Sequence, residues 1–188
     1  MTGLPLLLAR HGQTADNASG LILGRRDPPL SELGEQQAAG LAIQARARGV
    51  VAIWCSPLLR ALQTASVIGH TIGLDPAVVE DLVESARGDW EGIPQTVLAQ
   101  QTPELFAAFE AGDPDFVFPG GESIRSQVRR TRRALALVAA GPQPSLVVAH
   151  AGTIRAALIA AGRPVPPEQA LVNGEAVALD WSQDDRAS

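Results

Sequence analysis

The sequence has no lysine, no tyrosine and a single cysteine, Cys55, and no apolar stretch near the ~20 residues that a membrane-spanning helix needs. One cysteine excludes an internal disulfide and a cysteine-based zinc site. All fifteen basic residues are arginine and twenty residues are acidic, so the net charge is −5. An acidic chain without a basic run is a poor candidate for nucleic-acid binding. The amino terminus also lacks the basic region of a secretory signal, so we expect a soluble, cytoplasmic protein with no membrane partner.

The remaining composition is that of a globular protein, with 46% apolar and 19% charged residues. A chain of this length buries roughly 70% of its unfolded surface and needs no disulfide or structural metal to hold a core. We therefore expect one domain over residues 1–188. The sequence does not indicate an oligomeric state.

Apolar patterns alternate between strand-like runs and helix-like stripes. This alternation predicts an α/β fold with three α/β/α layers around a mostly parallel central sheet. Residues 184–188 read as a frayed tail. Predicted strands cover residues 6–9, 50–55, 78–79, 146–149 and 176–181, and predicted helices cover a segment capped by Ser31, then 58–72, 124–138 and 154–161.

The segment 93–119 interrupts the alternation and holds every phenylalanine of the chain. We expect it to form an excursion of helix and loop over the end of the sheet that carries the active site. Phe106 and Phe109 lie three residues apart and are expected to pack on a helix. Phe116 and Phe118 lie between prolines in a predicted loop, and they are the better candidates for a substrate lid.

Two of the three histidines follow predicted buried strands directly. His11 comes after the first strand with Arg10 before it, and His150 follows the strand at 146–149. Ligands of such sheets bind beyond the carboxyl ends of the strands. One histidine at a strand end is more often structural than catalytic, but two at equivalent positions favour a site. Arg60, which follows another strand, would bring a second guanidinium, and paired guanidinium groups suit a phosphate.

Six ordered blocks carry a resemblance to a known family, and they run from about residue 4 to 181. They are residues 8–17 around Arg10-His11-Gly12, Gly24 with residues 30–38, Ser56-Pro57 through Arg60, Glu84 with residues 88–92, residues 119–123, and His150-Ala151-Gly152 through Arg155. Together they resemble the signature of the histidine phosphatase superfamily, whose fold is called phosphoglycerate mutase-like.

The resemblance implies a role for each matching residue. His11 would be the nucleophile that forms a phosphohistidine, and Arg10, Arg60 and His150 would bind the phosphoryl oxygens. Glu84 would protonate the leaving alcohol, and its place in the motif favours it over Glu80, Asp81 and Glu91. The implied reaction needs no metal and no cofactor and acts on a small phosphate monoester. Further substrate contacts are expected from Asn17, Gln13, Thr14, Gly24 and Gly152.

Within the family, hydrolysis by a phosphatase competes with phosphoryl transfer by a cofactor-dependent phosphoglycerate mutase. Mutases generally have His-Gly-Asn at the second histidine, where this chain has His150-Ala151-Gly152, and a tyrosine after the acid, which this chain lacks. Mutases are also longer, so the resemblance favours a phosphatase. A non-catalytic module that binds a phosphate ligand is the other alternative, and the intact set of site residues argues against it.

Overall fold

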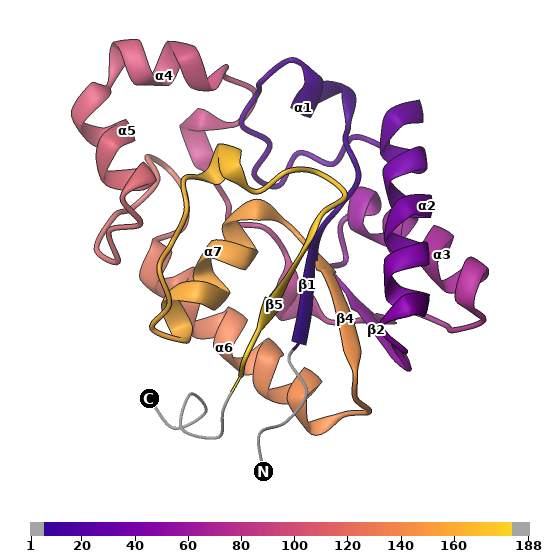
Figure 1. The fold of residues 1–188 in the computed structure, drawn as a ribbon. Coiled ribbons are helices and arrows are strands. Elements are labelled where there is room, and N and C mark those ends of the chain that lie inside the picture. The colour runs from indigo at the N-terminus through magenta and orange to yellow at the C-terminus, as the bar shows by residue number, and fades with distance from the viewer. Residues whose placement is uncertain (1–5, 182–188) are drawn as a thin grey trace.

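The computed structural model describes residues 6–181, and its centre is a five-stranded sheet with the order β3-β2-β4-β1-β5 (Figure 1). The first four of these strands pair in parallel, and only β5 runs antiparallel to its neighbour β1. The predicted α/β fold with a mostly parallel sheet is confirmed. The strands are β1 (Leu6–Arg10), β2 (Ala52–Cys55), β3 (Ala77–Val78), β4 (Ser145–Ala149) and β5 (Ala176–Leu179).

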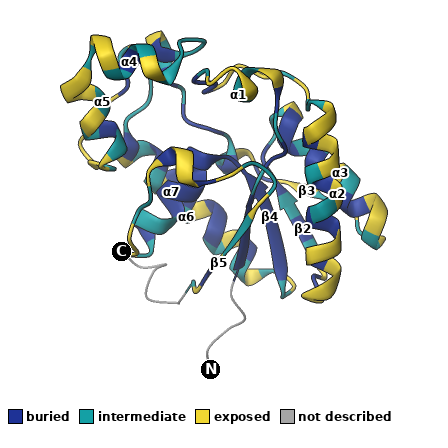
Figure 2. Ribbon diagram, turned by 45° about the horizontal axis from the view of Figure 1, so that its top comes forward, coloured by how far each residue is buried: buried dark blue, intermediate teal, exposed yellow. Residues whose placement is uncertain are grey.

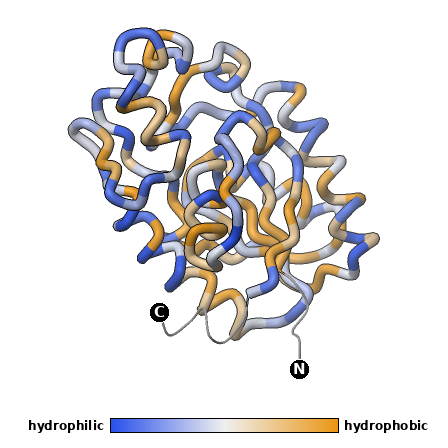
Figure 3. Tube along the Cα trace, turned by 60° about the vertical axis from the view of Figure 1, so that its left-hand side comes forward, coloured by the Kyte–Doolittle hydropathy of each residue, from blue (hydrophilic) through white to orange (hydrophobic). Residues whose placement is uncertain are grey.

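Helices cover both faces of the sheet (Figures 1 and 2). Successive residues of β1 point to opposite faces, as the pleat of a strand requires. Leu6 and Leu8 pack with the helices of one face, and Leu7 and Ala9 pack with those of the other. The first pair of helices is α6 (Ile124–Ala140) and α7 (Ala151–Ala160), and the second is α2 (Glu32–Ala47) and α3 (Leu59–Ile72). Figure 3 shows the most hydrophobic segments gathered in the strands between these helices.

The register of the central strands brings the two predicted site histidines together. Arg10 is level with Ala149 across the β1–β4 pair, and the backbone N–H of His11 donates to the carbonyl of Ala149 at 3.0 Å. Because parallel strands end at the same edge, His11 and His150 leave the sheet side by side. This edge, beyond the carboxyl ends of the parallel strands, is where ligands of such sheets bind.

Several element boundaries differ from the predicted ones, most of them by one or two residues. Helix α7 begins at Ala151 rather than at Ile154, because it is buried on nearly all sides and its first turn has no apolar stripe to mark it. Strand β2 begins at Ala52 and β5 ends at Leu179, each shorter than the apolar run that predicted it. Ser31 caps α2 as predicted, since its hydroxyl accepts from the N–H of Gly34. The predicted frayed tail at 184–188 lies outside the described residues.

The segment 93–119 contains α4 (Gln95–Gln101) and α5 (Pro103–Glu110), which lie beyond the sheet end in Figure 1. Its four phenylalanines surround Trp90 in one aromatic cluster, with ring centroids 5.5–6.1 Å from that of the indole. Phe116 and Phe118 are only 5% and 1% exposed, so the expectation that they form a lid is wrong. Phe106 is the ring that reaches the pocket.

Shorter elements complete the described chain. They are α1 (Ala15–Ala18) and three turns of 3-10 helix, η1 (Glu80–Leu82), η2 (Gly88–Trp90) and η3 (Glu168–Ala170). None of the helices within residues 6–181 combines the length and the apolar character needed to cross a membrane.

Candidate active site

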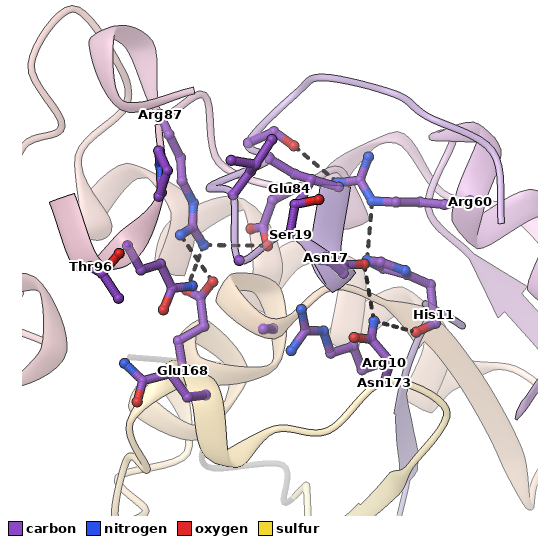
Figure 4. A pocket seen from close by; sticks show the side chains of 18 of the residues that line it. Arg10, His11, Asn17, Ser19, Arg60, Glu84, Arg87, Thr96, Glu168 and Asn173 are labelled. Carbon is purple, nitrogen blue, oxygen red and sulfur yellow. Dashed lines mark hydrogen bonds and ion pairs between the residues drawn. The ribbon is translucent and has the colours of Figure 1, made fainter. Parts of the chain in front are cut away.

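A pocket of about 520 Å³ opens beyond the carboxyl ends of the central strands (Figure 4). Arg10, His11 and Arg60 lie on one side of it, and Arg87 and Glu168 lie across from them, as the close-up shows. The lining combines side chains from the strand ends with side chains from the 93–119 segment and the loop before β5. The other lining residues are Asn17, Ser19, Gly20, Leu21, Leu23, Gly24, Glu84, Pro94, Gln95, Thr96, Ala99, Phe106, Ala151, Gln169 and Asn173.

The imidazole of His11 is buried and held in one tautomer by its neighbours. Its Nδ1 lies 2.7 Å from the carbonyl oxygen of Gly12, which can only accept, so Nδ1 carries the proton. Its Nε2 accepts from Nε of Arg60 at 3.1 Å. The pKa of His11 lies well below its usual value, because burial disfavours the charged ring and His150, Arg60 and Arg10 add to the effect. His11 is therefore a neutral imidazole with its lone pair on Nε2.

Arg60 extends from the first turn of α3 and is almost fully buried. Besides its bond to His11, its guanidinium donates to the carbonyl of Gly24 at 3.0 Å and to that of Arg26 at 2.6 Å, with Asp27 3.4 Å away. Gly24 has a φ of +54°, and a Cβ on it would lie 2.2 Å from a carboxylate oxygen of Glu91. The glycine predicted as a substrate contact thus also holds Arg60 in place.

Arg10 brings a second guanidinium to the same side. Its Nη1 donates to the carbonyl of Leu171 at 2.5 Å, while its Nε is buried and has no partner within the described residues. Burial lowers the pKa of Arg10, although Glu168 and Glu84 act in the opposite direction. A buried cation with an unused donor beside a pocket is ready to receive an anion.

His150 stands directly behind His11, with the two ring centroids 5.1 Å apart. Its Nε2 lies 2.7 Å from the hydroxyl of Ser56, and its Nδ1 has no hydrogen-bond partner among residues 6–181. Burial and the charges of Arg60 and Arg10 hold its pKa well below the usual value, so this ring is also neutral. His150 contacts the site through its neighbours and is not part of the pocket wall.

Glu84 is the predicted acid that reaches the pocket. One carboxylate oxygen accepts from the N–H of Ser85 at 2.8 Å and from the amide of Gln127 at 2.9 Å, and the other accepts from the N–H of Gly152 at 3.0 Å. Burial raises its pKa, but Arg87 at 3.5 Å and these donors outweigh burial and hold the pKa below its usual value. The three other acids considered from the sequence, Glu80, Asp81 and Glu91, do not line the pocket.

The predicted substrate contacts divide into two groups. Asn17 and Gly24 line the pocket, whereas Gln13, Thr14 and Gly152 do not. Thr14 caps α1 by accepting from the N–H of Asn17, and the side chain of Gln13 accepts from Ser31. The N–H of Gly152 is taken by Glu84. These three residues therefore hold neighbouring residues in place from outside the pocket wall.

Arg87, Glu168 and Asn173 are among the lining residues that were not singled out from the sequence. Asn173 donates to the carbonyl of His11 at 3.0 Å and to the side chain of Asn17 at 3.3 Å. Arg87 and Glu168 form a two-pronged ion pair, although they are far apart in the chain. Arg87 lies between Glu84 and residues 88–92 of a recognised block, and this position was the one available signal. Glu168 and Asn173 lie in a loop without periodicity, where no pattern marks them.

Comparison with known proteins agrees with this geometry. Residues 6–186 match the profile described as the histidine phosphatase superfamily (branch 1). The chain belongs to the histidine phosphatase superfamily. As in its structural relatives, the central sheet of the chain is flanked by helices. Within residues 6–181, no three side chains of histidine, cysteine, aspartate or glutamate form a group that could hold a metal ion.

Several relatives of this histidine phosphatase have names that state an activity. A glucosyl-3-phosphoglycerate phosphatase of Mycobacterium tuberculosis is 34% identical over 188 residues, covering 95% of this chain and 83% of its own. A solved structure of a mycobacterial enzyme of that name, in complex with VO₃, has a TM-score of 0.85 at 32% identity and covers 98% of this chain and 95% of its own. A bifunctional protein of M. tuberculosis is 38% identical over 153 residues, covering 80% of this chain, and the match spans only 42% of that relative.

Proposed function

We propose that the protein is a phosphomonoester hydrolase that acts on a small phosphorylated metabolite through a phosphohistidine at Nε2 of His11. The observation that carries the proposal is the state of that nitrogen. It is the unprotonated position of a buried, neutral ring, and it faces a pocket that holds two guanidinium groups. A neutral imidazole can attack phosphorus, and cations around the transferring group stabilise its charge.

The phosphoryl group would lie between Arg10 and Arg60. The guanidinium of Arg10, which lines the pocket, can donate to one phosphoryl oxygen, and Nε of Arg60 can turn from His11 to another. That exchange releases the lone pair of Nε2 for attack. Asn17 lines the same part of the pocket, and the neutral ring of His150 supports His11 from behind.

In the first step, Nε2 of His11 forms a bond to phosphorus while the bond from phosphorus to the ester oxygen breaks. Glu84 donates a proton to the departing oxygen, so the product is a neutral alcohol. In the second step, water attacks the phosphohistidine, Glu84 takes a proton from that water, and inorganic phosphate leaves. The free enzyme holds Glu84 ionised. The negative charge of a bound phosphate raises the pKa of this carboxyl and prepares it to act as the acid.

The proposal is tested by trapping the intermediate. Rapid quenching after mixing with a ³²P-labelled aryl phosphate should give protein-bound label that is stable in base and lost in acid. His11→Ala should abolish both the label and the turnover. His70→Ala is the matched control, because it removes the third histidine from an exposed position on α3.

Three results would contradict the proposal. Label that persists in His11→Ala would place the nucleophile elsewhere. Turnover that stops with a chelator and returns only with a divalent metal would indicate a different mechanism. Label that forms but passes to a second hydroxyl compound rather than to water would indicate a mutase.

A further inference from the structure

A buried ion pair forms part of the pocket wall across from His11 (Figure 4). Nη1 and Nη2 of Arg87 lie 3.0 and 2.6 Å from the two carboxylate oxygens of Glu168. Arg87 is only 1% exposed and Glu168 is 7% exposed. Arg87 follows Glu84 by three residues, and Glu168 lies on η3, in the loop that leads to β5.

The pair is buried within a small group of charges beside two aromatic rings, so the charges are held at a cost. Glu84 lies 3.5 Å from Nη2 of Arg87, and Nη1 of Arg155 lies 3.9 Å from a carboxylate oxygen of Glu168. The guanidinium carbon of Arg87 lies 5.2 Å from the ring centroids of both Phe109 and Phe118. Replacing a buried ion pair with well-packed apolar side chains is often neutral or stabilising. Stability alone therefore does not explain the ion pair. Its position on the pocket wall means that the two charges can also act on a bound substrate.

A count of the charged residues on the wall shows what a substrate would meet. They are Arg10, Arg60, Arg87, Glu84 and Glu168. A phosphate dianion would balance Arg10 and Arg60, which lie on the His11 side. Arg87 is already matched by Glu168 and has Glu84 on its other side at 3.5 Å. No cation on the wall is then left for a second negative group on the substrate.

Apart from these charged residues, the side chains that line the pocket are uncharged. We call the part formed by residues 94–106 and 168–169, together with Leu21, Leu23 and Arg87, the leaving-group wall. Apolar carbon comes from Leu21, Leu23, Pro94, Ala99 and Phe106, and neutral hydrogen-bonding groups come from Gln95, Thr96 and Gln169. Such a wall suits an alcohol that carries hydroxyl groups or apolar carbon.

We propose that Glu168 determines specificity, because by occupying Arg87 it selects phosphate esters of uncharged alcohols over esters whose alcohol carries a carboxylate. The proposal rests on the proposed hydrolase function and assigns its substrate class. The carboxylate of Glu168 would repel a carboxylate on the substrate, and such a repulsion against the wrong substrate contributes to specificity.

The test compares glycerol 3-phosphate with 3-phosphoglycerate, which differ only in a hydroxymethyl group against a carboxylate. In the parent, kcat/KM for glycerol 3-phosphate should be higher by about tenfold or more, which corresponds to about 1.4 kcal/mol. Glu168→Gln removes the carboxylate that pairs with both Nη1 and Nη2 of Arg87, so the ratio of kcat/KM for 3-phosphoglycerate to that for glycerol 3-phosphate should rise about tenfold. Glu168→Asp is the matched control, because it keeps the charge and should keep the parent's preference.

The outcomes separate this proposal from the proposed function. If no ester releases phosphate and no phosphohistidine forms, the hydrolase function is wrong. If the parent turns over both esters and prefers 3-phosphoglycerate, or if Glu168→Gln folds and leaves the ratio unchanged, the assignment of Glu168 is overturned.

A thermal melt shows whether Glu168→Gln folds. If it does not, Gln169→Arg takes its place, because it adds a cation at an exposed position on the same wall. This variant should raise the relative kcat/KM for 3-phosphoglycerate, and an unchanged ratio would overturn the proposal.

Discussion

The two sides of the pocket differ in how their side chains are held. On the phosphate side, Arg10 ends β1, Arg60 lies in the first turn of α3 and His150 caps α7. Each backbone position is set by a strand or helix of the layered fold, although loop carbonyls also hold the guanidinium groups of Arg10 and Arg60. On the leaving-group wall, Arg87 is placed by its contact with Glu168, 81 residues further along the chain, and by aromatic rings from the 93–119 segment. One side is set by local structure and the other by long-range packing.

This difference predicts different consequences of substitution. A change on the phosphate side should affect every phosphate ester alike, because all substrates share the phosphoryl group. A change near the leaving group should depend on the alcohol, and a change in the aromatic cluster should act first on stability.

Arg60→Ala should have the largest effect. Removing a preorganised group that stabilises the transition state costs up to about a thousandfold in rate, and Arg60 also donates to Nε2 of His11. We expect a loss of about this size in kcat/KM for an aryl and an alkyl phosphate alike. Arg48→Ala, at an exposed position after α2, is the control and should retain parent activity. If Arg60→Ala lowered kcat/KM for only one class of leaving group, the two sides of the pocket would not differ in function as described.

Phe118→Ala should lower the free energy of unfolding by about 3–5 kcal/mol, because it removes a ring from the centre of the aromatic cluster. Phe106→Ala, which removes a partly exposed ring of the same cluster, should cost less stability and raise KM for bulky esters. Chemical denaturation and steady-state kinetics measure the two quantities. Equal losses of stability in both variants would show that the cluster does not have the buried centre described above.

Glu84→Gln should reduce kcat by about a hundredfold for alkyl phosphates and by less for a good aryl leaving group, which needs little protonation. The measurement is a series of esters whose alcohols differ in pKa. Glu80→Gln, at an exposed position, is the matched control. Equal losses across the series would indicate that Glu84 does not act as the acid.

The buried histidines should make stability depend on pH. Their pKa values are lowered in the folded state by burial, so the unfolded chain binds more protons below pH 6.5. Each ring should then lower the free energy of unfolding by about 1.4 kcal/mol for each pH unit below that value. His150→Gln should reduce this slope between pH 6.5 and 5, whereas His70→Gln serves as the control. A slope unchanged in His150→Gln would contradict a neutral His150.

The same difference decides what could be predicted from the sequence. Buried runs followed by Arg10-His11 and by His150 locate the strand ends, and the ordered blocks add Arg60, Glu84 and Asn17. These signals are local, so the phosphate side and the layered fold could be anticipated. The partner of Arg87 could not, because neither Glu168 nor its loop has a periodic pattern. Phe116 was misjudged for a related reason, since a proline-rich loop looks exposed until Trp90 is seen to pack against it.

The first turn of α7 has a consequence for any attempt to redesign the enzyme. His150 stands at its start, and the N–H of Gly152 two residues later holds Glu84. A Cβ at Gly152 would lie 2.5 Å from one oxygen of Glu84 and 2.8 Å from Nη2 of Arg87, so even alanine does not fit. A shift of this helix would move the supports of the proposed nucleophile, His11, and of the proposed acid, Glu84, at the same time. New substrate preferences are therefore better sought at exposed lining positions such as Gln169 than in this turn.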